Sequence, residues 1–188
     1  RTSRTRTDAD LARRCRAADA GAWRQMIRRH TPMVYRLAVR MLGAAGAEAD
    51  DACQEVFMRV HRSLGSYDAT RSMAPWVARI AYHVCLRRVQ RLGRQADRPD
   101  DATLELAVDD RQRGPEELAQ SREASRLLMG ALEQLSVQDR ALLSLRYREG
   151  LSDAEVAEAV GMPVNTVKTR IFRARGKLRK MLGPTMQS

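Results

Sequence analysis

The stretch Leu151–Lys180 constrains the fold more than any other part of this chain, because it signals the end of one helix and the start of another. Ser152 and Glu155 have the spacing of a capping box, in which each side chain bonds a backbone N–H group at a helix start. Gly161 can take the left-handed conformation that ends a helix, and Pro163 prevents that helix from continuing. The stretch therefore predicts two helices joined by a tight turn.

The second helix of this pair combines an apolar face with a strongly basic surface. Asn165 or Thr166 can cap its start. Its apolar residues recur at steps of four, three and four, which places them on one inward face: Val167, Ile171, Ala174 and Leu178. From Asn165 to Lys180 there are seven basic residues and no acidic one. Such a helix pair is typical of a DNA-binding helix-turn-helix, whose second helix enters the major groove.

The outward side chains of the second helix are candidate DNA contacts. Four of them lie on the face left over by the apolar stripe and could read duplex DNA: Lys168, Thr169, Phe172 and Arg173. Three more lie on the flanks and could anchor phosphates: Arg170, Arg175 and Lys177. The alternative is a helical hairpin with a solvated basic face. The joint presence of a cap, a glycine turn and an aromatic on the polar side favours DNA binding.

Charge and hydropathy narrow the class of protein. The 188-residue chain carries a formal net charge of +11, which indicates a polyanionic partner. Only eight residues are aromatic, strand-like alternation is nowhere sustained, and helical periodicity recurs throughout, so the expected fold class is all-α. No apolar run is long enough to cross a membrane, and the basic N-terminal RTSRTRT lacks the apolar segment of a secretory signal. We expect this stretch to be a disordered leader or a truncated start, and the protein to be cytoplasmic.

Cysteine and histidine usage argues against a metal site or a disulfide framework. Cys15, Cys53 and Cys85 are odd in number, widely spaced and set in helical patterns, so we expect buried or half-buried free thiols. The three histidines show no ligand spacing with them. There is also no nucleophile–base pair or phosphate-binding loop, so the sequence predicts neither a cofactor nor an enzyme.

Helical periodicity divides the first half of the chain into four segments and a loop. Pro32 is expected to kink or break the second segment. Gly43 and Gly46 end that segment. The expected helices are Ala9–Ala18, Ala20–Met41, Ala49–Leu64 and Pro75–Leu92, with a loop over Gly65–Ala74.

The loop and the helix after it combine aromatic and basic residues. Three aromatics, Tyr67, Trp76 and Tyr82, stand near four basic side chains, Arg79, His83, Arg87 and Arg88. Cations that contact phosphates and flat rings on which unpaired bases stack are what binding of single-stranded nucleic acid requires. A core position for Trp76 fits the pattern equally well.

The helix Ala49–Leu64 carries a mixed polar face that could be a docking surface or simple solvent surface. Its members are Asp51, Gln54 and Glu55, with Phe57 beside them. Spacing alone does not decide between the two readings.

A change in composition separates two expected domains. Between Arg98 and Pro115 there are three basic and five acidic residues, in a segment rich in turn formers. We therefore assign a first domain to residues 1–97, a linker to 98–115 and a second domain to 116–188. The second domain would hold four helices, Glu116–Gln134, Ser136–Tyr147 and the helix-turn-helix pair.

From about Ala20 to Leu182 the chain resembles the extracytoplasmic-function sigma factors, which are bacterial transcription initiation subunits of the sigma-70 family. The order and spacing of three motifs carry the resemblance: DDACQEVFMRVHRSL at Asp50–Leu64, APWVARIAYHVCLRR at Ala74–Arg88, and LEQLSVQDRALLSLRYREGLSDAEVAEAVGMPVNTVKTRIFRARGKL at Leu132–Leu178. The resemblance implies two helical domains, a helical bundle of sigma region 2 and a four-helix domain of sigma region 4, that bind core RNA polymerase and promoter DNA.

The resemblance also implies roles for the candidate residues. Asp51, Gln54, Glu55 and Phe57 would dock on core RNA polymerase, which favours the docking reading of that helix. The loop before Trp76 and the helix after it would recognise and open the promoter's minus-ten element, and Lys168, Thr169, Phe172 and Arg173 would read the minus-thirty-five element. An inhibitory anti-sigma factor is a further expected partner.

The chain departs from the family pattern near the minus-ten candidates. Pro75 directly precedes Trp76, and His83 and Arg87 stand where the resemblance leads us to expect Asn and Asp. The competing hypothesis is a free-standing helix-turn-helix regulator that binds operator DNA as a dimer. A dimeric regulator needs a self-complementary apolar seam, whereas the first half of this chain offers a basic, aromatic-edged helix.

Overall fold

The computed structural model describes residues 2–43, 46–95 and 125–183, and these residues form helices, turns and no strand. Four helices come from the first half of the chain: α1 (Thr2–Arg16), α2 (Ala20–Leu42), α3 (Ala47–Ser63) and α4 (Met73–Gln95), with a short 3-10 turn η1 (Leu64–Ser66) after α3. The second half contributes a helix over 125–133, then α6 (Val137–Leu143), a π-helical turn η2 (Ser144–Arg148), α7 (Asp153–Val160) and α8 (Val164–Leu182). The all-α fold class is confirmed.

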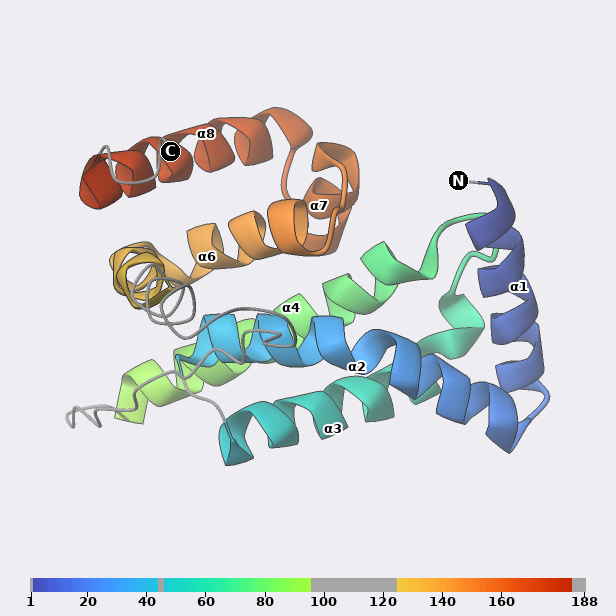
Figure 1. Cartoon of the computed structure of the whole chain (residues 1–188). Coiled ribbons are helices and arrows are strands. Elements are labelled where there is room, and N and C mark those ends of the chain that lie inside the picture. Colours follow the sequence, from blue (N-terminus) through green and yellow to red (C-terminus); the bar gives the residue numbers. More distant parts are fainter. Residues whose placement is uncertain (1, 44–45, 96–124, 184–188) are drawn as a thin grey trace, which may run out of the picture.

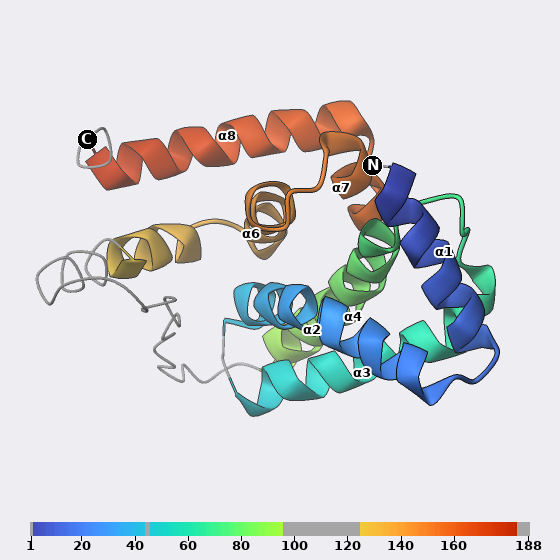
Figure 2. The same ribbon diagram turned by 45° about the vertical axis from the view of Figure 1, so that its right-hand side comes forward.

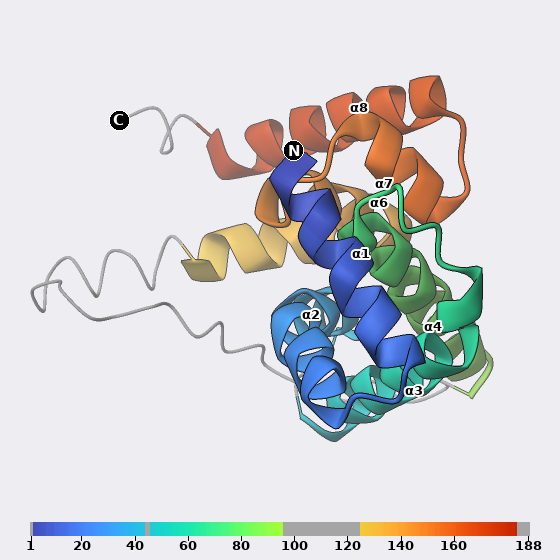
Figure 3. The same cartoon turned by 90° about the vertical axis from the view of Figure 1, so that its right-hand side faces the viewer.

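The helices form two groups that pack on each other (Figure 1). In the first group α2, α3 and α4 contact one another, and α1 packs on α2. In the second group α8 contacts both α6 and α7, and the turn η2 contacts both of them as well. Helix α4 lies between the groups, because it contacts α2 and α3 as well as α7 (Figure 2). Helix α8 lies on the far side of the second group from α2, α3 and α4 in each view (Figure 3).

Local sequence signals explain where α2 begins and ends. Asp19 accepts hydrogen bonds from the N–H groups of Gly21 and Ala22 and so caps the helix start, and Gly43 ends the helix in the left-handed conformation with φ of 72°. The helix continues through Pro32, so of the two expected outcomes at that residue, a kink or a break, the break is wrong. Packing explains the tolerance, since Met33 and Val34 are buried directly after the proline.

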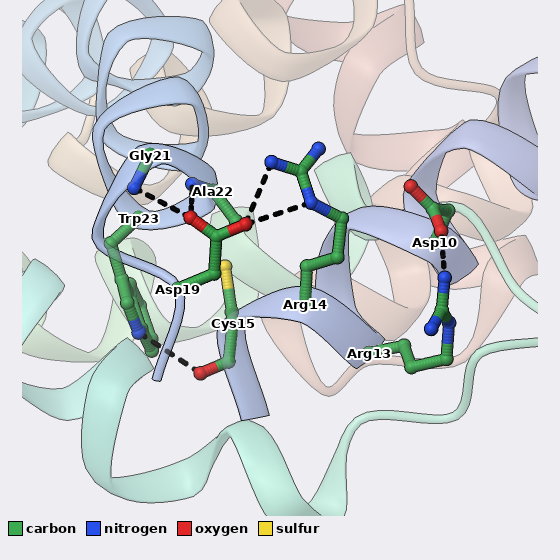
Figure 4. Close-up of polar contacts among 8 residues, drawn as sticks. All are labelled: Asp10, Arg13, Arg14, Cys15, Asp19, Gly21, Ala22 and Trp23. Atoms are coloured by element: carbon green, nitrogen blue, oxygen red, sulfur yellow. Dashed lines mark hydrogen bonds and ion pairs between the residues drawn. The ribbon is translucent and has the colours of Figure 1, made fainter. Parts of the chain in front are cut away.

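The expected disordered leader is also wrong, because α1 begins at Thr2 rather than at Ala9. Leu11, Ala12 and Cys15 of α1 are buried against the bundle, and this contact stabilises the helix. Figure 4 shows how α1 joins α2: the Arg14 guanidinium donates to the same Asp19 carboxylate that caps α2, and the Trp23 indole donates to the carbonyl of Cys15.

The helix-turn-helix forms as the sequence predicts, with one difference. The capping box of Ser152 and Glu155 is present, and Gly161 takes the left-handed conformation with φ of 72°. Helix α8 begins at Val164 with Pro163 at the cap position, so Asn165 and Thr166 lie inside the helix and do not cap it. Proline is suited to this place because its fixed φ directs the chain into a helix and it lacks an N–H group.

Among the residues that the structure describes, two ion pairs connect the groups. Arg36 of α2 donates two hydrogen bonds, of 2.7 and 2.8 Å, to the carboxylate of Glu149, which is only 8% exposed. Arg71, in the loop before α4, pairs with Glu158 of α7. Buried apolar residues form one cluster that includes both groups.

Two further findings concern the described residues as a whole. All three cysteines are free and buried, as predicted. None of the described helices combines the length and the apolar character that crossing a bilayer requires.

Candidate nucleic-acid and docking surfaces

The outer face of α8 presents the residues predicted to read duplex DNA. Lys168, Thr169 and Arg173 are exposed, and Phe172 is 76% exposed. The opposite side of α8 is buried through Val167, Ile171, Ala174 and the half-buried Leu178. Burial of that stripe fixes the rotation of the helix, so the basic face points away from the core. A straight helix of this kind fits the width of a major groove.

The three predicted phosphate anchors of α8 divide into two that are exposed and one that is not free. Arg175 and Lys177 are exposed. Arg170 is 26% exposed and its guanidinium bonds the Asp139 carboxylate at 2.7 and 2.8 Å and the Gln138 side chain at 2.7 Å. The structure therefore corrects the prediction that Arg170 anchors a phosphate: this side chain holds α8 against α6.

A groove of about 790 Å³ runs between α3 and α4 and contains several of the residues predicted to bind a single strand. Trp76, Arg79, His83 and Arg87 line it from α4. From α3 and the turn after it come residues that the sequence analysis did not single out: Met58, Arg59, Arg62, Ser63 and Ser66. With four arginines and one glutamate, Glu55, the groove lining is cationic, and it includes one large aromatic, the half-buried Trp76.

Sequence reasoning missed the α3 side of this groove, although the spacing of its residues places them on one helical face. Glu55, Met58, Arg59 and Arg62 recur at steps of three, one and three, which is one face of a helix. Met58 is 54% exposed and adds a large apolar side chain to this face. The periodicity was available in the sequence, but nothing in it indicates that this face lies opposite α4.

Tyr67 and Tyr82 are not available to stack on bases in this structure, which corrects their predicted role. Tyr67 is 3% exposed, and its hydroxyl donates to the carbonyl of Arg71. Burial, together with nearby Asp8 and Asp68, raises the pKa of Tyr67 to about 12. Tyr82 is 1% exposed, and burial raises its pKa too, against the opposing charge of Arg170 in the second group. Of the three predicted aromatics, Trp76 alone lines the groove.

The Tyr67 ring nevertheless has a place in the site, because it supports the Trp76 ring. The two ring centroids are 5.2 Å apart and their planes are inclined by 49°. This tilted contact is a favourable arrangement for two aromatic rings. Tyr67 therefore acts from beneath the groove surface.

Arg88 is tied to acidic side chains and is not a free cation. Its side chain is 14% exposed and pairs with Glu55 at 3.1 Å and Glu48 at 3.4 Å. Arg59 also pairs with Glu55, at 2.7 Å. Burial alone would raise the pKa of the Glu55 carboxyl, but hydrogen bonds from Arg88 and Arg59 outweigh it and the pKa is lowered. The network joins α3 to α4 beside the groove.

His83 lies in the groove under conditions that keep it neutral. Burial lowers the pKa of its imidazole below the ordinary value of 6.5, and the charges of Arg79 and Arg87 lower it further. At neutral pH the side chain therefore offers a hydrogen-bonding ring rather than a positive charge.

Two of the four α3 residues predicted to dock on a partner are exposed. Asp51 and Gln54 are exposed, whereas Glu55 is half-buried and paired with arginines. Phe57 is half-buried and packs against the core. The face could contact another helix pair through its exposed members.

Comparison with known proteins identifies both groups of helices. Residues 26–95 match the family model described as Sigma-70 region 2, and residues 125–178 match Sigma-70, region 4. The "ECF RNA polymerase sigma factor SigM" of Mycobacterium tuberculosis is 32% identical over 95% of this chain and 86% of its own length. The "ECF RNA polymerase sigma factor SigW" of Bacillus subtilis is 31% identical over 87% of this chain and 90% of its own length.

Two solved structures share the fold. CnrH, solved in complex with the cytosolic domain of CnrY, is 26% identical, with a TM-score of 0.66 over 93% of this chain and 96% of that one. The sigma factor RpoE from Bartonella quintana, solved with the anti-sigma factor NepR, is 19% identical, with a TM-score of 0.67 over 85% of this chain and 95% of that one.

Proposed function

The chain belongs to the extracytoplasmic-function (ECF) sigma factors of RNA polymerase, and on that premise we propose that its two helical groups bind one promoter in two different forms. Helix α8 binds the upstream element as duplex DNA. The groove between α3 and α4 binds one strand of the opened downstream element. The contrast between an outward basic helix and a cationic groove lined by one half-buried aromatic, Trp76, carries this proposal.

The proposed domains follow the two helical groups. Residues 1–97 form the domain that docks on core polymerase and opens the minus-ten element, 98–115 link the domains, and 116–188 form the domain that binds the minus-thirty-five element. The change in charge between residues 98 and 115 supports this division.

Recognition of the minus-thirty-five element is assigned to the exposed face of α8. Lys168, Thr169, Phe172 and Arg173 read base edges or groove shape, because they lie on the side opposite the buried stripe. Arg175 and Lys177 anchor phosphates on the flanks. Arg170 is not assigned a direct DNA contact because its donors bond Asp139 and Gln138.

Opening of the minus-ten element is assigned to the groove. Unstacking a base costs a few kcal/mol, so a protein that holds the extruded base against an aromatic ring and lines the strand with cations offsets that cost. Trp76 provides the ring, and Arg79, Arg87 and the half-buried His83 line the path of the strand.

Docking on core RNA polymerase is assigned to the outer face of α3, through Asp51, Gln54 and Phe57. The exposure of the first two supports the assignment. Because α3 also lines the groove, a polymerase bound on its outer face would lie next to the captured strand.

A sigma factor acts where the polymerase and the chromosome are, so we place this chain in the cytoplasm and assign it a regulatory rather than a catalytic role. The RpoE structure holds an anti-sigma factor. We propose a partner of that class for this chain as well, one that covers the α3 face, the groove or α8.

Run-off transcription tests the proposal. Core RNA polymerase with the purified chain and a library of randomised promoters should yield transcripts from a shared pair of elements, while the chain alone should bind duplex DNA weakly. Strong, specific binding of a symmetric operator by the chain alone, without start-site selection by the polymerase, would instead identify a dimeric helix-turn-helix regulator.

A further inference from the structure

Helix α1 holds both ends of the segment that leads into the groove. At the first end, Arg16 donates to the carbonyl of Leu64 at 3.1 and 3.3 Å and to the carbonyl of Tyr67 at 2.7 Å. At the other end, the Asp8 carboxylate accepts a hydrogen bond of 3.0 Å from the backbone N–H of Met73, the first residue of α4. These partners are 48 to 65 residues apart in the sequence. Figure 3 shows α1 running across the first helical group.

The contact at Met73 does for α4 what a local cap does elsewhere. The first N–H groups of a helix have no partner within it and favour a negative charge. Asp8 supplies that charge from another helix, is 1% exposed, and also pairs with Arg29 of α2 at 2.7 Å. A buried carboxylate of this kind is costly unless it is paired, and here two partners are fixed by it.

Helix α1 is itself held in place by contacts with α2, so it can fix the position of the residues that Asp8 and Arg16 bond. Arg14 bonds Asp19 at 2.8 and 2.9 Å, Asp19 caps α2, and the Trp23 indole donates to the Cys15 carbonyl at 3.1 Å (Figure 4). The Trp23 ring in turn contacts His61 of α3, with centroids 4.7 Å apart. Helix α1 is thus bonded to α2 directly and linked to α3 through Trp23.

The segment that α1 holds forms part of the groove. Ser66 and Trp76 line it, and the Tyr67 ring supports the Trp76 ring from below. Since Arg16 fixes the Tyr67 backbone and Asp8 fixes the start of α4, movement of α1 would displace the surface on which a base is held. Helix α1 lies outside residues 26–95, which match the region 2 family model.

We propose that Asp8 and Arg16 are positioning residues for minus-ten recognition, acting through residues 64–76 without touching DNA. The inference rests on the proposed function of the groove. Its physical content is that α1 fixes the groove before DNA arrives, so that strand binding does not have to order the segment.

We call the contacts of Asp8 and Arg16 with residues 64–76 the brace. Two substitutions test the brace, and a third is the matched control. Arg16→Met keeps the stem of the side chain and removes three hydrogen bonds, and Asp8→Asn removes the charge. Arg13→Met makes the same chemical change one turn away, on a side chain that is 76% exposed and bonds only Asp10 among the residues that the structure describes. Arg16→Lys serves as the conservative variant, which should restore part of the effect.

The first measurement is amide hydrogen exchange of the full chain without polymerase. Exchange over residues 64–76 should rise roughly tenfold or more in Arg16→Met and Asp8→Asn, because each loses charge-assisted hydrogen bonds, while peptides of α8 stay unchanged. Arg13→Met should match the wild type. Unchanged exchange over 64–76 in both brace variants would overturn the inference, and faster exchange everywhere would show a general loss of stability instead.

The second measurement is discrimination by the holoenzyme. On a promoter selected by the run-off experiment, the ratio of transcription from the intact minus-ten element to that from single-base variants should fall several-fold in the brace variants. Affinity for core polymerase should stay constant, which a merely destabilised domain would not allow. If the wild-type chain itself selects no start site, the proposed function fails; if it does and the brace variants discriminate as it does, only the role of α1 fails.

Discussion

The arginines and lysines of α8 and those around the groove differ in how far they are already engaged. Within the residues that the structure describes, Lys168, Arg173 and Lys177 are exposed and form no ion pair. Around the groove, Arg59 and Arg88 share Glu55, and Arg79 reaches the carbonyl of Glu158. Duplex DNA has a regular shape, so exposed cations on a helix surface suffice to contact its phosphates. An unpaired strand has no fixed shape, so we expect it to need a groove whose side chains are already held in place.

The comparison predicts its largest effect at Trp76. Trp76→Ala should lower open-complex formation by up to about 3 kcal/mol, roughly 100-fold, because a stacked base contributes about 1–3 kcal/mol. Binding of the holoenzyme to the minus-thirty-five duplex should not change. Permanganate reactivity of unpaired thymines measures the first quantity and a duplex competition assay the second.

Trp76→Phe is the control, since it keeps a flat ring in contact with Tyr67 and should keep most of the activity. Trp76 also packs against the core. If Trp76→Ala lowers opening, duplex binding and thermal stability together, the ring is a structural residue and the groove has no stacking surface.

On the duplex side, Arg173→Ala should weaken binding by about 1–3 kcal/mol at particular bases of the minus-thirty-five element and little at others. The reason is that an exposed guanidinium on the outward face can form a two-pronged contact with one base edge. Holoenzyme binding to a set of single-base variants measures this pattern. An equal loss on every sequence would make Arg173 another phosphate contact.

Arg170 sharpens the comparison, because on α8 it behaves like the engaged arginines of the groove. Arg170→Met should lower the free energy of unfolding of the second helical group by about 1–2 kcal/mol, since Asp139 and Gln138 lose charge-assisted bonds. Sequence preference on DNA should stay as in the wild type. Arg179→Met, an exposed position near the end of the same helix, is the control and should leave stability within about 0.5 kcal/mol.

How much the sequence could predict depends on whether a signal is local. Capping boxes, glycine stops and apolar stripes are local, so α2, α7 and the orientation of α8 were predicted closely. The same apolar stripe put Phe172 and Arg173 on the outside, where they lie. These features need no knowledge of what packs against them.

Features that depend on a distant partner could not be predicted. Arg170 was predicted to be free because its partner Asp139 is 31 residues away in the sequence. Tyr82 was predicted to be available for stacking because the residues of the second helical group near it, Arg170 and Asp139, are far from it in the sequence. The leader looked disordered because the anchors of α1, Met73 and Leu64, belong to another segment. The groove itself requires α3 and α4 to be brought face to face.

Lys177 provides a smaller test of the duplex surface. Lys177→Ala should weaken binding of all duplex sequences alike by less than about 1 kcal/mol and lower the salt dependence by roughly one counterion, because a phosphate contact carries no sequence information. Titrations at several salt concentrations measure the slope. If Lys177→Ala and Arg173→Ala both lower affinity equally on all sequences, the division between base readers and phosphate anchors is wrong.

The smallest effect is expected from the protonation of His83. Burial first, and then Arg79 and Arg87, lower its pKa below 6.5, while Glu55, Arg59 and Arg62 line the same groove from α3. The unfolded chain therefore binds a proton at a pH where the folded chain does not, so folding stability falls as the pH drops below 6.5. The loss ends below the folded pKa and is absent above neutral pH.

His83→Gln should flatten this part of the pH profile by a few tenths of a kcal/mol, a small amount because the side chain is only half-buried. Denaturant unfolding of both proteins at several pH values between about 5 and 8 measures the difference, a range that brackets the titration of histidine. Strand binding should act in the opposite direction, since phosphates favour the protonated ring and raise affinity at low pH. An affinity for single-stranded DNA that rises equally in wild type and His83→Gln would place His83 outside the path of the strand and leave that path to Arg79 and Arg87.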